Sequence, residues 1–309
     1  KQWKKKLKRK LFLEYRTFLK IMKKNKIYSY SKINLSLRII KKIKEKKLHA
    51  INSLVVFAKI YDEISINQIS KKKDIIKFSG PFIKNINKKK NTISKTLEVL
   101  RENNFLNDKY FKINIKKNIP TQAGLGGGSM NAASLISYLK KKYKLQINTK
   151  KMSRIASCIG SDVIIGLKFS NTFFDNSKNL VKRFKNKTNF YLLLVKPNIG
   201  CSTELAYRRN KKFSKKYGKK SIKNFKNLFS INELKHDTND LEGITFKMYP
   251  KIRQLNEFLN SQKNCKFSRM TGSGSVCVGY YKDLASAKKA KLNIGKKFPK
   301  YWCKLSKAI

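Results

Sequence analysis

The sequence has few of the residues that build disulfide frameworks, metal centres and membrane spans. Its 309 residues include five cysteines, with no C-x-x-C pair among them, and two histidines. This scarcity argues against a disulfide framework or a structural zinc site, excludes a multi-histidine metal centre and suits a reducing compartment. The longest apolar runs, such as Phe190–Val195, are far too short to span a membrane. We therefore expect no membrane partner and a cytoplasmic location, with a plastid-like organelle as the alternative.

Acidic side chains are also scarce, because 17 Asp and Glu stand against 74 Lys and Arg, for a formal net charge of +57. A charge of this size attracts polyanions, and nucleic acid is the first candidate. The excess is almost all Lys, spread along the chain with abundant Ile and Asn, and these three residues share A/T-rich codons. No element clusters Arg with aromatic residues as a nucleic-acid surface typically does. We expect no specific nucleic-acid partner, and a lysine-rich nucleic-acid-binding protein is kept as the alternative from a different class.

Length and composition predict two domains built around folded cores. Apolar residues make up 40% of the chain and aromatic residues 11%, which argues against wholesale disorder. A basic N-terminal extension is expected over residues 1–21, because Met22 offers a natural start just before the first strand-like run. An organelle-targeting remnant is the alternative there. A polar, lysine-rich stretch at 171–188 is the expected boundary, which gives domains at 22–185 and 186–309.

Hydrophobic periodicity predicts strands and helices interspersed along the chain. Alternation and short apolar runs predict strands at residues 26–40, 54–57, 62–66, 110–120 and 189–198, and another after a glycine turn at 272–274. Helical spacing predicts helices at residues 90–104, 129–143, 149–160 and 283–298. Asn91 or Thr92 is the expected N-cap of the first helix, and Thr149 that of the third, with Gly160 as its stop. This mixture predicts an α+β fold rather than a doubly wound parallel sheet.

A glycine-rich loop between a strand and a helix is the most specific local feature. It reads G-L-G-G-G from Gly124 to Gly128 and leads into the helix expected from Ser129. Glycines let an anion approach the main chain, and the first helical turn offers unpaired N–H donors with partial positive charge. The loop therefore predicts a phosphate site, although a tight structural turn also fits the loop taken alone. A P-loop and a dinucleotide fingerprint are excluded because the G-K-[ST] ending and the G-x-G-x-x-G spacing are missing.

The loop and its flanks, P-T-Q-A-G-L-G-G-G-S-M-N-A-A from Pro120, resemble the nucleotide-binding motif of the GHMP kinase superfamily. Five further segments resemble, in the same chain order, the branch of that superfamily that phosphorylates 4-diphosphocytidyl-2-C-methyl-D-erythritol in non-mevalonate isoprenoid synthesis. They are S-Y-S-K-I-N-L-S-L-R-I, L-H-A-I-N-S-L, I-G-S-D-V-I-I-G-L, V-K-P-N-I-G-C-S-T-E-L-A-Y and R-M-T-G-S-G-S-V-C-V. The six segments extend over about residues 27 to 290, so the resemblance covers most of the chain.

This resemblance implies a two-domain GHMP kinase fold, with a ribosomal protein S5 domain 2-like N-terminal domain and a ferredoxin-like C-terminal domain. It also implies ATP and Mg²⁺ as cofactors, and a monomer or homodimer that phosphorylates the 2-hydroxyl of the small-molecule cytidyl substrate. Another GHMP kinase, acting on mevalonate derivatives or homoserine, is the alternative within the superfamily. The paired Gly127-Gly128 before Ser129 and the L-H-A-I-N-S-L segment argue against that alternative.

Two residues match the catalytic pair of the resembled branch. Asp162 aligns with the base that takes the proton of the acceptor hydroxyl, and Lys32 with the lysine that stabilises charge on the transferring phosphoryl group. Each has a plainer alternative, because the S-D pair after Gly160 also suits a helix cap. A lysine in this chain is by default a solvated surface residue. The position of Lys32 inside an apolar strand favours the catalytic role.

The resemblance also assigns an ATP site and a substrate site. The residues implied to bind ATP are Pro120, Gly124, Leu125, Gly126, Gly127, Gly128, Ser129 and Asn131. Of these, Ser129 is the implied aid to Mg²⁺. The residues implied to bind the cytidyl substrate are Asn34, His49, Thr203, Tyr207, Gly272 and Gly274. His49 would read the cytosine edge and Tyr207 would stack on the ring, a contact worth about 1–3 kcal/mol, although each taken singly is typical of an ordinary half-buried residue.

The chain departs from the resembled branch at four places. Leu48 stands where a Tyr usually forms the second face of the cytosine clamp, and Met130 replaces a second hydroxyl after Ser129. The segment I-G-S-D-V-I-I-G-L lacks the usual Pro, and the following S-N-T-F-F-D-N-S-K-N-L lacks the usual G-x-G-E. These departures bear on the details of substrate binding more than on the kinase class.

Overall fold

The computed structural model describes residues 25–43, 48–84, 86–185, 188–218 and 228–309. The predicted extension at residues 1–21 lies outside the described residues. The strands are β1 (Lys26–Ile43), β2 (Leu48–Ile69), β3 (Ile75–Ser79), β4 (Tyr110–Lys116), β5 (Asn171–Asp175), β6 (Leu180–Phe184), β7 (Tyr191–Lys196), β8 (Phe267–Met270), β9 (Cys277–Tyr281) and β10 (Trp302–Lys307). The helices are α2 (Thr92–Glu102), α3 (Gly127–Lys142), α4 (Thr149–Ile159), α5 (Val163–Gly166), η2 (Asn176–Lys178), α6 (Thr203–Arg209), α9 (Ile231–Lys235), α10 (Glu242–Met248), α11 (Pro250–Asn260) and α12 (Leu284–Lys297). The interspersed elements confirm the predicted α+β fold.

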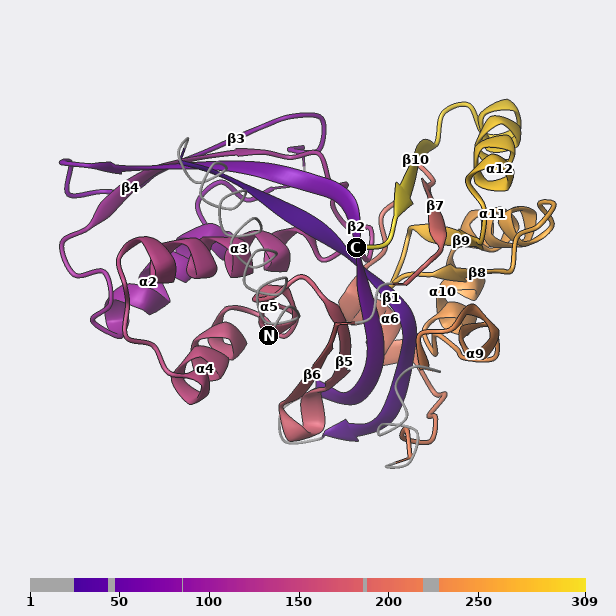
Figure 1. The fold of residues 1–309 in the computed structure, drawn as a ribbon, viewed down its shortest axis with the longest axis horizontal. Coiled ribbons are helices and arrows are strands. Elements are labelled where there is room, and N and C mark those ends of the chain that lie inside the picture. The colour runs from indigo at the N-terminus through magenta and orange to yellow at the C-terminus, as the bar shows by residue number, and fades with distance from the viewer. Residues whose placement is uncertain (1–24, 44–47, 85, 186–187, 219–227) are drawn as a thin grey trace, which may run out of the picture.

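The larger of two sheets is built on the long strands β1 and β2, which pair antiparallel along nearly their whole length (Figure 1). Its order is β3-β4-β2-β5-β6, with β1 on β2, and only β3 and β4 run parallel. The prediction of two separate strands at 54–57 and 62–66 was wrong, because one strand runs through both. The pairing with β1 continues between the two runs through a bulge, since Tyr30 pairs with Tyr61 and the next residue, Ser31, pairs with Ala58.

Three helices cover one face of this sheet, and Figure 1 shows α2, α3 and α4 together on that side. Their apolar stripes pack on β2 and β4 around fully buried residues such as Leu97, Ile113 and Leu135. Asn91 caps α2 through a capping box, as one of the two predicted caps. The predicted cap Thr149 was wrong by one residue, because the side-chain amide oxygen of Asn148 accepts the N–H of Lys151 at 2.8 Å instead.

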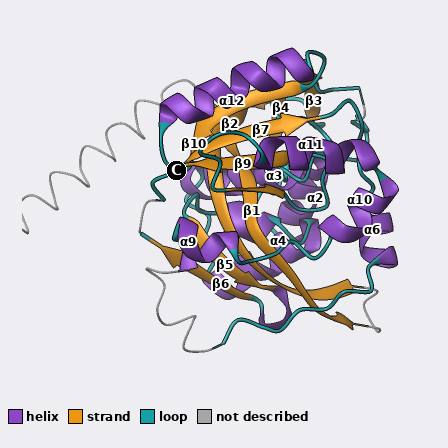
Figure 2. Cartoon of the chain, turned by 90° about the vertical axis from the view of Figure 1, so that its right-hand side faces the viewer, coloured by secondary structure: helices purple, strands orange, loops and turns teal. Residues whose placement is uncertain are grey.

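The smaller sheet has the order β10-β7-β9-β8 and is entirely antiparallel. Numbered along the chain, this is the order 4-1-3-2, with α10 and α11 between the first two strands and α12 between the last two. Figure 2 shows α11 and α12 lying along this part of the molecule. The arrangement is the ferredoxin-like one, so the predicted C-terminal fold is confirmed.

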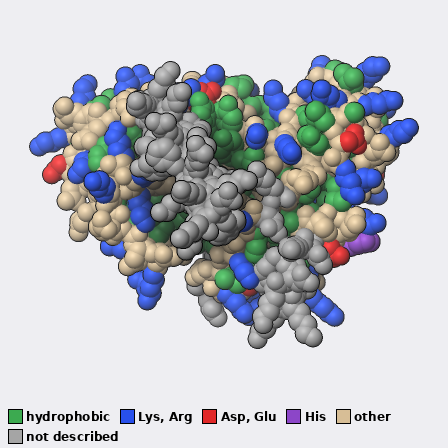
Figure 3. Space-filling model, viewed as in Figure 1, with side chains coloured by type: hydrophobic (Ala, Val, Ile, Leu, Met, Phe, Trp, Pro, Cys, Tyr) green, Lys and Arg blue, Asp and Glu red, His purple; other side chains and the backbone are tan. Residues whose placement is uncertain are grey.

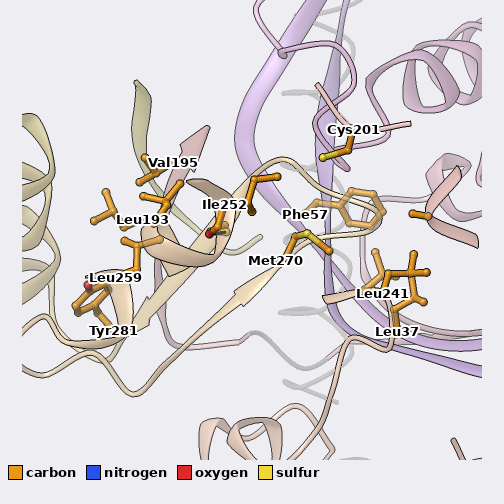
Figure 4. Packing of buried hydrophobic residues seen from close by; sticks show 14 of the residues in the cluster. Leu37, Phe57, Leu193, Val195, Cys201, Leu241, Ile252, Leu259, Met270 and Tyr281 are labelled. Carbon is orange, nitrogen blue, oxygen red and sulfur yellow. Dashed lines mark hydrogen bonds between the residues drawn. The ribbon is translucent and has the colours of Figure 1, made fainter. Parts of the chain in front are cut away.

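A continuous apolar core joins the two sheets. Leu37 and Phe57 of the long strands lie in the same buried cluster as Leu193 and Met270 of the small sheet (Figure 4). The main chain of Leu37 also bonds across, donating to Thr238 and accepting from Asp240, each at 2.9 Å. β1 therefore contributes to the packing of both sheets. The predicted domain boundaries, 22–185 and 186–309, stay a prediction.

The surface carries the lysine excess in a dispersed form. On the face drawn in Figure 3, Lys and Arg side chains are scattered over both lobes instead of gathering in one patch. Of the helices in the described residues, none is long and apolar enough to cross a membrane.

Candidate active site

A cavity of about 960 Å³ lies where β1, the glycine loop, α5 and α6 meet. Nearly all of the residues that the sequence singled out line it. They are Lys32, Asn34, His49, Pro120, Gly124, Leu125, Gly126, Gly127, Gly128, Ser129, Asp162, Thr203, Tyr207 and Gly272. Residues more than 200 positions apart are thus brought to one place. Asn131 and Gly274 are not among the residues that line the cavity.

The glycine loop turns directly into α3, and its backbone leaves no room for a side chain at Gly124 or Gly126. Gly124 and Gly126 have φ angles of +72° and +66°. A Cβ on Gly126 would lie 2.7 Å from the Cγ of Lys32, and one on Gly124 would lie 1.9 Å from the carbonyl oxygen of Thr271. Gly126 is the N-cap of α3 and, as a glycine, has no side chain to cap the first N–H groups. The start of α3 therefore offers bare N–H donors to an anion.

Lys32 and Asp162 form an ion pair in this cavity. The Lys32 Nζ lies 3.1 Å from Asp162 Oδ2, and the Lys32 residue is only 5% exposed, so it is not a solvated surface lysine. Its main-chain N–H donates to Leu125 O at 3.0 Å, which fixes β1 against the glycine loop. Asp162 precedes α5, but no capping hydrogen bond to its side chain is found among the described residues. The alternative in which Asp162 only caps the next helix is therefore not supported.

Asn34 orients this pair. Its Oδ1 accepts a hydrogen bond from Lys32 Nζ, while its Nδ2 donates to Ser53 Oγ at 2.8 Å. Its main-chain N–H donates to Thr271 Oγ1 at 2.9 Å, and that hydroxyl is in turn 3.3 Å from Gly124 O. The amide of Asn34 is thus held in one orientation, and the Lys32 ammonium with it.

The other end of the cavity is aromatic. The rings of His49 and Tyr207 lie 5.2 Å apart between centroids, tilted by 37°. Burial and the neighbouring Lys42 lower the pKa of His49 below its usual 6.5, which favours the neutral ring. The Nε2 of His49 is buried without a hydrogen-bond partner among the described residues. Burial, with a smaller effect of Asp162, raises the pKa of Tyr207, so this phenol stays protonated.

The C-terminal glycine turn closes the site from the small sheet. Thr203 Oγ1 and Ser273 Oγ lie 2.7 Å apart and both line the cavity. Gly272 is beside them, with a φ of +57°. Gly274 instead packs away from the cavity, because a Cβ there would meet Met270 Sδ at 2.7 Å.

One departure of the sequence, Met130, and one predicted ATP-binding residue, Asn131, lie beneath the site. Met130 is fully buried, and its Sδ would lie 2.8 Å from a Cβ on Gly166 of α5, so it packs under the loop. Asn131 is also buried, and its Oδ1 has no hydrogen-bond partner among the described residues. The side chain of Leu48 lies outside the described residues.

Sequence reasoning missed several residues of the cavity. Lys117 is buried and pairs with the fully buried Asp62, whose other carboxylate oxygen accepts the N–H groups of Asn118 and Ile119 at 2.8 and 2.9 Å. This clamp sets the chain direction into the glycine loop. One signal was present, since Lys117 stands just before the loop, but a lysine-rich sequence hides it. Thr92 was proposed only as a cap, yet its Oγ1 donates to Gly128 O at 2.9 Å.

Comparisons with known proteins agree with this geometry. Residues 91–170 match the family model of the GHMP kinases N terminal domain, and residues 219–300 match that of the GHMP kinases C terminal. A crystal structure of 4-(cytidine 5'-diphospho)-2C-methyl-D-erythritol kinase superposes with a TM-score of 0.70 at 20% identity, covering 91% of this chain and 99% of that one. A homoserine kinase from Cytophaga hutchinsonii gives 0.66 at 14% identity, covering 92% and 95%. At these identities the structures show the shared fold alone.

Sequence relatives are closer. The 4-diphosphocytidyl-2-C-methyl-D-erythritol kinase of Pelagibacter ubique is 42% identical over 285 residues, which is 92% of this chain and 99% of that protein. The kinase of the same name from a Wolbachia of Drosophila simulans is 32% identical over 278 residues, covering 88% and 94%. Identity of this extent establishes that the chain belongs to the GHMP kinase family, in the group whose members are named 4-diphosphocytidyl-2-C-methyl-D-erythritol kinases.

Proposed function

We propose that this protein transfers the γ-phosphoryl group of ATP to the 2-hydroxyl of 4-diphosphocytidyl-2-C-methyl-D-erythritol. The observation that carries the proposal is the Lys32–Asp162 pair, with 3.1 Å between Nζ and Oδ2, placed between a bare helix N-terminus and an aromatic pocket. The name shared by relatives up to 42% identical supports the same activity. One end of the cavity suits a polyphosphate and the other a base.

In this proposal Asp162 accepts the proton of the 2-hydroxyl as its oxygen attacks the γ-phosphorus in line with the departing ADP. Lys32 faces the same carboxylate and stabilises negative charge on the transferring phosphoryl oxygens. Asn34 holds the ammonium toward the reaction site. The N–H groups at the start of α3 bind the phosphates of ATP, and the positive end of the helix favours that anion.

The residues at the start of α3 fit ATP with Mg²⁺. Gly126 keeps the cradle open where a Cβ would collide with Lys32, and Ser129 supplies a hydroxyl on the first helical turn. Magnesium in kinases takes few protein oxygens and completes its shell with phosphates and water. No group of three or more His, Cys, Asp or Glu that could hold a metal occurs in the described part of the chain, which suits that mode. When bound, the ion neutralises charge on the β- and γ-phosphates.

The aromatic end is proposed to select the base. Tyr207 offers a face for stacking on cytosine, and the unpartnered His49 Nε2 is available to a polar base edge. Thr203 and Gly272 line the same cavity and are proposed to contact the diphosphate of the substrate. The assignment of Asn131 to ATP binding and of Gly274 to substrate binding stays a prediction. Neither residue is among those that line the cavity.

A coupled assay of ADP release tests the proposal with three acceptors: the cytidyl diphosphate substrate, mevalonate and homoserine. We expect turnover that depends on the cytidyl substrate and on Mg²⁺. Turnover with mevalonate or homoserine alone would assign the chain to another GHMP activity. Tight, salt-sensitive binding of nucleic acid without ATP turnover would support the nucleic-acid alternative instead.

The location and assembly are part of the same proposal. Five free cysteines suit a reducing compartment, so we propose the cytoplasm, with a plastid-like organelle as the alternative. A monomer or a homodimer is expected, and sedimentation of the purified protein decides between them.

A further inference from the structure

Arg183 on β6 is half-buried and contacts the end of α5, the single-turn helix that follows Asp162. Its Nη1 lies 2.6 Å from Ile165 O and 2.8 Å from Lys168 O, and its Nη2 lies 2.7 Å from Ile164 O. Nη1 also donates to Thr172 Oγ1 at 2.8 Å, on the residue that pairs with Arg183 across the sheet. One guanidinium therefore holds three main-chain carbonyls of one short segment.

Two of these carbonyls, those of Ile164 and Ile165, belong to α5, and the third, that of Lys168, lies two residues beyond its end. α5 spans only Val163–Gly166, and the last four carbonyls of any helix lack partners within it. A planar guanidinium with several donors can satisfy such a group of carbonyls at once. Arg183 thus ties the end of α5 to the β5–β6 edge of the large sheet.

The opposite side of α5 is fixed by packing. Gly166 lies so close to α3 that a Cβ would be 2.8 Å from Ala133 Cβ and from Met130 Sδ. In Figure 1 the helix lies beside α3 and α4, next to the β5–β6 end of the sheet. With its end tied to the sheet and its side against α3, α5 has one position, and Asp162 at its start shares that position.

The partial burial of the Arg183 guanidinium carries a desolvation cost. Among the described residues, the acceptors of its hydrogen bonds are uncharged oxygens, and desolvation lowers the pKa of Arg183 to about 10. The hydrogen bonds to α5 and the residues after it offset that cost, which ties the guanidinium to the position of this helix.

We propose that Arg183 is a positioning residue that holds α5, and through it Asp162, in line with Lys32 for phosphoryl transfer. The inference rests on the proposed function, because it assumes that Asp162 is the base. Arg183 itself touches neither the cavity nor the substrate. It acts on the rate of transfer and not on the affinity for either substrate.

Hydrogen–deuterium exchange of the full-length protein tests the restraint without any turnover. In Arg183→Met, amides of residues 163–168 should exchange at least about tenfold faster, while those of α3 stay unchanged. Arg183→Lys, which keeps the charge and some donors, should give an intermediate rate. Arg154→Met, which removes an exposed guanidinium on α4, is the matched control and should match the wild type. Unchanged exchange at 163–168 in Arg183→Met would overturn the inference, whatever the substrate proves to be.

Kinetics on the acceptor that the wild type turns over test the consequence. We expect kcat of Arg183→Met to fall about 10- to 100-fold, as for a misplacement of about 1 Å, with both KM values within about twofold. Arg183→Lys should have a kcat between those of Arg183→Met and the wild type. If Arg183→Met does not fold, the kcat of Arg183→Lys is compared with that of the wild type instead. A merely structural role predicts lower melting temperature with unchanged kcat per folded molecule, and that result contradicts the inference. A wild type that turns over none of the three acceptors instead contradicts the proposed function.

Discussion

The two ends of the cavity differ in how firmly they are built. At the reaction end, Lys32 is almost fully buried, and its ammonium contacts both Asp162 and Asn34. At the base end, His49 and Tyr207 meet only by a tilted ring contact, and the His49 Nε2 has no partner in the described part of the chain. The reaction end is therefore preorganised, whereas the base end leaves polar and apolar surface for a ligand to satisfy. This difference predicts that substitutions at the reaction end lower kcat, whereas substitutions at the base end raise KM for the cytidyl substrate.

The largest effect is expected from the ion pair. Asp162→Asn or Lys32→Ala should lower kcat on the order of 10²–10⁴-fold, because each removes a group that acts in the transition state. Affinity for a non-hydrolysable ATP analogue, measured by calorimetry, should change little. Asp108→Asn and Lys77→Ala alter exposed residues of the same types and serve as controls. Normal turnover in both ion-pair variants would remove the basis for their assigned roles.

The next effect concerns the glycine loop. Gly126→Ala forces a Cβ toward the Lys32 side chain at a positive φ, so the cradle and Lys32 must both shift. We expect kcat/KM for ATP to fall about 100-fold, as for a 1 Å misplacement. Gly295→Ala, on an open face of α12 where a Cβ meets nothing within 4 Å, is the matched control and should leave activity unchanged. If kcat/KM for ATP is the same in both variants, the close contact between Gly126 and Lys32 does not contribute to catalysis.

A smaller effect, on KM alone, is expected at the base end. Tyr207→Leu removes the stacking face, and the KM for the cytidyl substrate should rise about tenfold with kcat nearly constant. Tyr143→Leu, at the far end of α3 and bonded to Gln68, controls for loss of a half-buried tyrosine. A fall in kcat without a change in KM would break the contrast between the two ends.

The smallest effect is a pH dependence. Burial and Lys42 hold the pKa of His49 below 6.5, so the folded protein binds fewer protons there than the unfolded chain does. The contribution to stability is present above pH 6.5 and is lost as the pH falls through the lowered pKa. The KM for the cytidyl substrate should be flat from pH 6.5 to 8 and rise a few-fold below the lowered pKa. In His49→Gln, this rise of KM at low pH should be absent. A rise that persists in the variant would have to come from another titrating group.

Motif residues were predictable from the sequence because they lie close together in the chain. The glycine loop, with its strand before and helix after, is a local pattern, and its backbone geometry follows from the residue types. Lys32 and Asp162 were found only through their resemblance to a family, since nothing local brings residues 130 positions apart together. Their contact at 3.1 Å depends on the antiparallel β1–β2 pairing and on the packing of α5.

The features that could not be predicted from the sequence are polar contacts between residues far apart in the chain. Asp62 and Lys117 look like surface charges in a lysine-rich chain, yet they form a buried pair that steers the loop. Arg183 is one basic residue among many, and its role depends on carbonyls that only the fold exposes to it. The continuous β2 was missed because a bulge at residues 58–61 breaks the alternation between its two runs, while the pairing with β1 depends on the partner strand.

The most direct test of the central claim is the product of the wild-type reaction. ³¹P NMR of ATP, Mg²⁺ and the cytidyl diphosphate substrate should show a new phosphomonoester that grows with ADP, and proton spectra should locate it at the 2-position. The same reaction with Asp162→Asn should form it on the order of 10²–10⁴-fold more slowly. ADP formed without the ester, or an ester formed only on mevalonate or homoserine, would contradict the account.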